Sequence, residues 1–127
     1  MIRRRVVLWG LWVATACSVE TGSTEPQADP AKVVREYFAA IEAGDCDAMR
    51  ARLGGPALGR LDEDGCAARL REYEEHGASL RGIDQVDVDG RDADRRLVKT
   101  RVGMGDAERT IIIGLRAHGT GWRIERI

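Results

Sequence analysis

The sequence predicts an α+β domain in which N-terminal helices pack on a curved, four-stranded antiparallel sheet. Apolar residues recur at helical spacing as far as about residue 76, and after Gly77 they alternate with polar residues, as in half-buried strands. Short turns containing glycine separate the alternating segments, which favours hairpins over helical crossovers. The helices are therefore expected on the concave face of an antiparallel meander.

The first helix has the clearest sequence signals. Asp29 is a favourable N-cap, Pro30 suits the first helical position, and Gly44 follows the last periodic residue. Its apolar face is formed by Val33, Val34, Tyr37, Phe38 and Ile41. We expect this face to pack on the sheet.

Further helical segments are expected before the sheet. Asp45 can cap a helix over 46–53, which Gly54-Gly55-Pro56 would end, and another helix is expected over 65–76. Between them, 56–61 is expected to form only a short helical turn.

Four strands are predicted from alternating apolar residues. These are Val86 and Val88; Val98, Thr100 and Val102; Ile111, Ile113 and Leu115; and Trp122 and Ile124. Ile83 is out of phase with Val86 and Val88, which predicts a bulge or bend in the first strand.

The N-terminus has the pattern of an export signal. Three arginines precede an apolar run of 11 uncharged residues from Val6 to Ala16, too short for the roughly 20 residues of a membrane-spanning helix. Ala14-Thr15-Ala16-Cys17 resembles a bacterial lipobox, which implies that Cys17 is acylated and anchored in the lipid bilayer. The alternative is ordinary cleavage after Ala16, which would leave Cys17 as a free thiol.

These signals divide the chain into three parts. Residues 1–16 are expected to be the signal peptide, 17–29 a flexible polar tether, and 30–127 one folded domain. The protein is expected to be exported to the cell envelope. Ser18 after the cysteine indicates an outer-membrane lipoprotein facing the periplasm, or a plasma-membrane anchor if the organism has a single membrane.

The charge balance excludes one class of partner. Loss of Arg3, Arg4 and Arg5 with the signal would leave 17 basic residues of the original 20 against 21 acidic ones, a net charge of −4. A mildly acidic surface argues against nucleic-acid binding, which needs a basic face.

Two cysteines remain once Cys17 is set aside. In an oxidising compartment we expect Cys46 and Cys66 to form a disulfide between two helices, although two buried free thiols are the alternative. Neither has a neighbouring histidine or a C-x-x-C partner, so no metal site is predicted.

Two segments resemble a known superfamily. Val-Val-Arg-Glu-Tyr-Phe-Ala-Ala-Ile-Glu-Ala-Gly-Asp over 33–45 and Gly-Trp-Arg-Ile-Glu-Arg-Ile over 121–127 look like the first helix and last strand of cystatin-like domains in the nuclear transport factor 2 superfamily. The resemblance is greatest to small lipoprotein domains of unknown function. It implies a cone between helices and sheet. The superfamily includes ketosteroid isomerase, scytalone dehydratase and polyketide cyclases, alongside many members with no known reaction, so the fold does not imply a function.

Enzymes of this superfamily place an Asp, His or Tyr in the cone. The residues that could lie there are Tyr37, Tyr73, Asp84, His118 and Trp122. Tyr37, Tyr73 and Trp122 are expected to line a pocket, chiefly as core residues, whereas His118 lies in a predicted turn and His76 at a helix end. No pair matches the enzymes' motifs, so no catalytic residue and no cofactor are assigned.

Two functions remain open. The first is a membrane-tethered, non-catalytic accessory module that binds a partner protein or a small apolar ligand. The second is a small isomerase or cyclase that acts on a hydrophobic carbonyl compound. A deep pocket that ends at a buried ionisable group would favour the enzyme, and a cone filled by side chains would favour the module.

Overall fold

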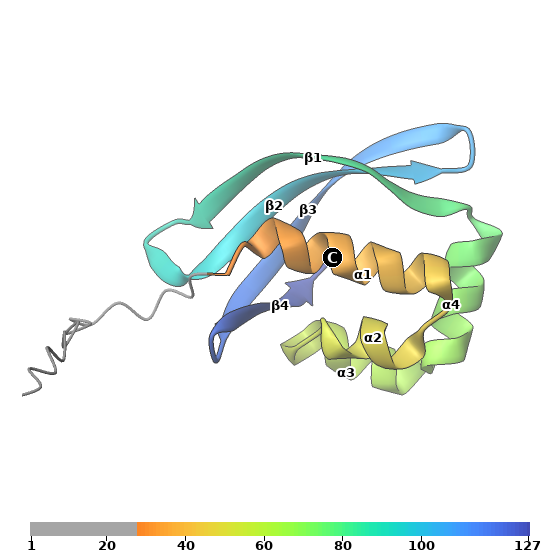
Figure 1. The fold of residues 1–127 in the computed structure, drawn as a ribbon, viewed down its shortest axis with the longest axis horizontal. Helices are drawn as coiled ribbons and strands as arrows, with labels where there is room; N and C mark the ends of the chain where they lie inside the picture. The colour runs from red at the N-terminus through yellow and green to blue at the C-terminus, as the bar shows by residue number, and fades with distance from the viewer. Residues whose placement is uncertain (1–27) are drawn as a thin grey trace, which may run out of the picture.

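In the part of the chain that the structure describes, four helices precede four strands (Figure 1). The computed structural model describes residues 28–127, so the predicted signal peptide, the predicted acylation site Cys17 and most of the predicted tether lie outside the described residues. The elements are α1 (Pro30–Ala43), α2 (Cys46–Ala51), α3 (Gly55–Asp64), α4 (Cys66–Glu75), β1 (Ala78–Asp89), β2 (Asp92–Met104), β3 (Ala107–His118) and β4 (Gly121–Arg126).

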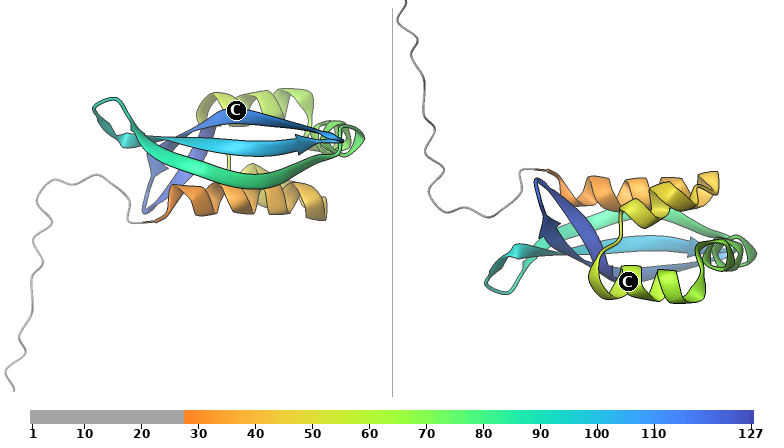
Figure 2. Two further views of the ribbon diagram at one scale, coloured as in Figure 1. Left: turned by 90° about the horizontal axis from the view of Figure 1, so that it is seen from above. Right: turned by 90° about the horizontal axis from the view of Figure 1, so that it is seen from below.

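The strands form one antiparallel sheet in the order β1-β2-β3-β4. The sheet arches over α1, and the helices lie on its concave side, as the two views of Figure 2 show. The α+β class, the meander and the helices on the concave face are therefore confirmed. α4 stands at one end of the sheet, next to the start of β1 (Figure 1).

Capping residues determine where α1 begins and ends. The Asp29 carboxylate accepts a hydrogen bond of 2.9 Å from the backbone N–H of Ala31. Gly44 adopts a left-handed conformation with φ of 65°, and its N–H donates to the carbonyls of Ala40 and Ile41. A glycine adopts this conformation without the steric cost that a Cβ atom would add.

The second and third helices differ from the prediction. α2 ends at Ala51 rather than at Leu53, because Leu53 forms a parallel β-bridge with Ile124 of β4. The short turn predicted over 56–61 is wrong, since α3 is a ten-residue helix. Only Ala57 and Leu61 of α3 are buried, so its apolar pattern is too short to indicate a full helix from the sequence.

The first strand is irregular, as Ile83 predicts. Its pairing with β2 shifts between Leu80 and Gly82 and again between Ile83 and Gln85. The alternation predicts that Val86 and Val88 lie on the buried face of the sheet, but their exposed fractions are 39% and 50%.

The exposure of these two valines results from their position along the sheet and not from the face on which they lie. Val86 pairs with Val98, whose side chain is fully buried, so Val86 shares the concave face of the sheet. The β1–β2 hairpin extends past the start of α1 (Figure 2), so the helices do not cover it.

Candidate functional site

The space between helices and sheet, which we call the cone, is occupied by packed side chains. The helices contribute Val34, Phe38, Met49 and Leu61, and the strands contribute Val98, Ile113, Leu115 and Ile124, all of them buried. Phe38 is 3% exposed and Trp122 is 4% exposed. The core of the domain therefore fills the space in which a large ligand would have to lie.

Tyr37 and Tyr73 are the two predicted pocket residues that the fold brings together. Tyr37 projects from α1 and Tyr73 from α4, and their hydroxyl oxygens are 2.8 Å apart. The rings meet edge to face, with centroids 6.4 Å apart. Tyr37 is 1% exposed, whereas Tyr73 is half-buried. The pair thus links the first helix to the last.

The environment of Tyr37 keeps its hydroxyl protonated. Burial raises the pKa of Tyr37 well above its usual value, and the neighbouring Tyr73 raises this pKa further. The Arg69 cation acts in the opposite direction. Arg69 forms an ion pair with Asp64. At neutral pH Tyr37 is therefore a phenol, which can donate or accept a hydrogen bond.

A small cavity of about 140 Å³ adjoins Tyr37. Its lining comprises Tyr37, Leu53, Ala57, Arg60, Leu61, Arg69 and Ile127. The phenol and the two guanidinium groups are hydrogen-bond donors suited to a carbonyl or carboxylate oxygen. The volume is well below the roughly 300–1,000 Å³ of typical small-molecule pockets. The cavity could thus hold a small polar group, but not the body of a polyketide or steroid.

A larger groove of about 560 Å³ lies at the end of the molecule where α1, α4 and β1 meet. Its lining comprises Ile41, Glu42, Ala43, Gly44, Leu70, Tyr73, Glu74, Gly77, Ala78 and Ser79. Apart from Tyr73, sequence reasoning assigned none of these residues to a pocket. In the sequence Glu42 and Glu74 look like parts of ordinary solvated helix faces, and only the fold places them in the lining of one groove.

Trp122 is held by contacts that serve the packing of the fold. Its Nε1–H donates a hydrogen bond of 2.8 Å to the backbone carbonyl of Ala28, and the guanidinium of Arg96 lies 4.8 Å from the ring centroid. A buried tryptophan usually needs such a partner for its N–H. The hydrogen bond holds the segment just before α1 against β4, and the Arg96 contact joins β2 to β4.

The remaining candidates do not join the tyrosine pair. Asp84 lies on β1 and forms an ion pair of 2.8 Å with Arg101. His76 is the exposed C-cap of α4. His118 lines a different hollow, of about 160 Å³, that shares no lining residue with the Tyr37 cavity. The structure thus brings together Tyr37, Tyr73 and Arg69, of which sequence reasoning missed Arg69.

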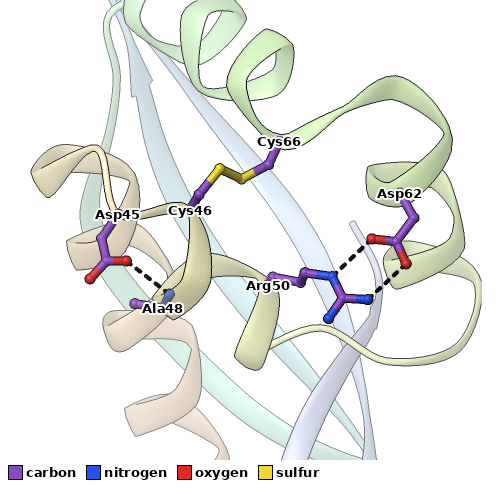
Figure 3. The surroundings of a disulfide bond; sticks show 6 residues. All are labelled: Asp45, Cys46, Ala48, Arg50, Asp62 and Cys66. Carbon is purple, nitrogen blue, oxygen red and sulfur yellow. Dashed lines mark hydrogen bonds and ion pairs between the residues drawn. A yellow bond between two sulfur atoms is a disulfide. The ribbon is translucent and has the colours of Figure 1, made fainter.

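Cys46 and Cys66 form a disulfide that joins the start of α2 to the start of α4 (Figure 3). Their Cα atoms are 5.8 Å apart, within the usual range for a disulfide. In the same region Asp45 caps α2 by accepting from the N–H of Ala48, and Arg50 holds Asp62 of α3 through two hydrogen bonds. The pairing expected from the sequence is present, and it agrees with an oxidising compartment.

The described part of the chain has neither a cluster of metal ligands nor a membrane-spanning helix. Residues 28–127 contain no group of three or more His, Cys, Asp or Glu side chains that could hold a metal ion. None of the helices formed by these residues has the length and hydrophobicity needed to cross a bilayer.

Two solved structures show a distant similarity to this chain. No protein-family model matches the chain, and no curated protein matches it significantly. A crystal structure of a "putative polyketide cyclase" from Xanthomonas campestris pv. campestris is 18% identical, with a TM-score of 0.44, and the match covers 76% of this chain and 87% of that chain. Another protein described in the same words, from Pseudomonas putida KT2440, is 17% identical, with a TM-score of 0.43 and coverage of 79% and 91%. At this level of similarity neither match supports an argument about this chain.

Proposed function

We propose that this chain is a non-catalytic binding module of the bacterial cell envelope, tethered to a membrane through acylated Cys17. The observation that carries the proposal is the filled cone. Ile113 and Ile124 on the strands and Val34 on α1 have no exposed surface, so the space in which an enzyme of this fold would hold its substrate is packed.

The position of the ionisable groups also supports a module. Asp84 is engaged by Arg101 on the sheet, and His76 and His118 are exposed at the ends of their elements. General acid–base catalysis needs a group within hydrogen-bond reach of the reacting proton, and these three residues do not converge on one site. A binding role needs only a surface of suitable shape and charge.

A second candidate function is a small isomerase or cyclase acting on a hydrophobic carbonyl compound. The observation that favours it is the Tyr37–Tyr73 pair beside a cavity, because a protonated phenol can stabilise a developing enolate oxygen. The volume of about 140 Å³ would admit the carbonyl group alone.

An exchange assay separates these two functions. The purified protein is incubated in D₂O with a set of hydrophobic ketones and 1,3-diketones, and proton NMR follows deuteration of the carbon next to the carbonyl. A binding module leaves the exchange rate at that of the buffer. A rate above buffer that is lost in Tyr37→Phe would refute the module and establish the enzyme.

A further inference from the structure

The groove between α1, α4 and β1 has the size and surface of a small-molecule site. Its volume of about 560 Å³ lies inside the roughly 300–1,000 Å³ range of ligand pockets. Ile41, Leu70 and Tyr73 supply an apolar surface, and each is partly buried against the core. The surface is therefore held in place by the fold.

Both charged residues that line the groove are acidic. Glu42 comes from the last turn of α1 and Glu74 from the last turn of α4, and no lining residue is basic. Within residues 28–127 neither glutamate forms an ion pair or a side-chain hydrogen bond. Many other carboxylates of the domain, such as Asp62 and Asp84, are paired with an arginine.

Two helix ends add to this negative charge. The carboxyl end of an α-helix carries roughly half a negative charge, which lysine or arginine in the last turn commonly offsets. α1 ends at Ala43 and α4 at Glu75, and neither has a basic residue in its last turn. The two ends meet at the groove, since Ala43 and Gly44 line it from one side and Glu74 and Gly77 from the other.

We infer that this groove binds a small organic cation with an apolar body. The apolar surface would take the body of the ligand, and Glu42, Glu74 and the two helix ends would attract its charge. The aromatic ring of Tyr73 offers a further favourable contact for a cation. Anionic molecules of the same shape would be repelled. The inference rests on the proposed binding function, for which it supplies a site and a ligand class.

A matched ligand series tests the inference. Octylammonium, 1-octanol and octanoate share one apolar body and differ in charge, and each is titrated into the ¹⁵N-labelled protein while amide NMR shifts are recorded. Octylammonium should shift the amides of residues 41–44 and 70–79 and bind at least about tenfold tighter than octanoate at low salt. Added salt should reduce this difference.

Variants that remove carboxylate charge test whether Glu42 and Glu74 attract the ammonium group. Glu42→Gln combined with Glu74→Gln should weaken octylammonium binding about three- to tenfold. The control Asp47→Asn combined with Glu63→Gln removes the same charge outside the groove lining and should leave the affinity unchanged. Circular dichroism verifies that both variants fold.

Three results would overturn the inference: no binding of octylammonium, equal binding of octanoate, or shifts confined to residues around the Tyr37 cavity. None of these bears on the exchange assay, in which turnover of a carbonyl compound would instead refute the binding module.

Discussion

The Tyr37–Tyr73 hydrogen bond joins a buried hydroxyl to a half-exposed one, so its two partners should not be equivalent. In Tyr73→Phe the hydroxyl of Tyr37, a residue only 1% exposed, loses its hydrogen-bond partner, which should cost about 1–3 kcal/mol of unfolding free energy. In Tyr37→Phe the remaining Tyr73 hydroxyl can reach water, so the cost should be about 1 kcal/mol or less. Urea denaturation of both variants measures which of them loses more unfolding free energy. An equal or reversed order of the two stability losses would contradict the unequal burial of the two hydroxyls.

The raised pKa of Tyr37 predicts a loss of stability in alkali. The unfolded chain releases this phenolic proton near pH 10 while the folded protein retains it, so the unfolded state binds fewer protons above that pH. Stability should therefore fall above about pH 10, by at most about 1.4 kcal/mol per pH unit from this group. Denaturation from pH 9 to about pH 11.5 should give a shallower fall in Tyr37→Phe than in the wild type. Identical slopes would mean that Tyr37 titrates normally.

The sequence predicts Tyr37 and Tyr73 as pocket residues, but it does not predict which side chains surround them. The helical spacing that places Tyr37 in the core is local, so it can be read from neighbouring residues. The approach of Arg69 and Tyr73 to Tyr37 depends on how α4 docks. No local pattern encodes that docking.

Among the helices, α4 depends most on a covalent link. It has no fully buried residue, whereas α1 buries Ala31, Val34, Tyr37, Phe38 and Ala40. The disulfide closes a loop with a sequence separation of 20 residues, which should stabilise the fold by about 3 kcal/mol on the chain-entropy model. Reduction should therefore lower stability and release α4 before the other helices.

Hydrogen exchange with and without a reductant tests this role of the disulfide. Amides of α4 should exchange faster in reduced protein, while those of β2 and β3 should change less, because these strands are paired on both sides. The double variant Cys46→Ala and Cys66→Ala should behave as the reduced protein and be insensitive to reductant. Unchanged α4 protection would mean that packing alone holds this helix.

The elements that the sequence predicts best are those with strong local signals. The caps of α1 and the alternation in β2 to β4 agree with the structure because each is determined by neighbouring residues. α3 and the end of α2 depend on contacts with β4, which are distant in sequence. Val86 and Val88 alternate as buried residues do, but they are exposed on β1, whose hairpin with β2 extends past the start of α1 (Figure 2).

The anchoring of the whole molecule rests on Cys17 and remains a prediction. If the Cys17 thiol is acylated, globomycin should block cleavage of the signal, and unprocessed precursor should accumulate in cell fractions. A Cys17→Ser variant should lose membrane association while its folded domain is unchanged. Normal processing in globomycin would contradict lipidation and favour cleavage after Ala16.

A methyl NMR titration tests most directly whether a ligand of this protein binds outside the cone. Methyl groups of Val98, Ile113 and Ile124 report on the cone, and those of Ile41 and Leu70 report on the groove. Titration with octylammonium and with a hydrophobic ketone should shift the groove methyls with the cation and leave the cone methyls unchanged with either compound. Saturable shifts at Ile113 and Ile124 with the ketone would contradict a filled cone and, with it, the binding module.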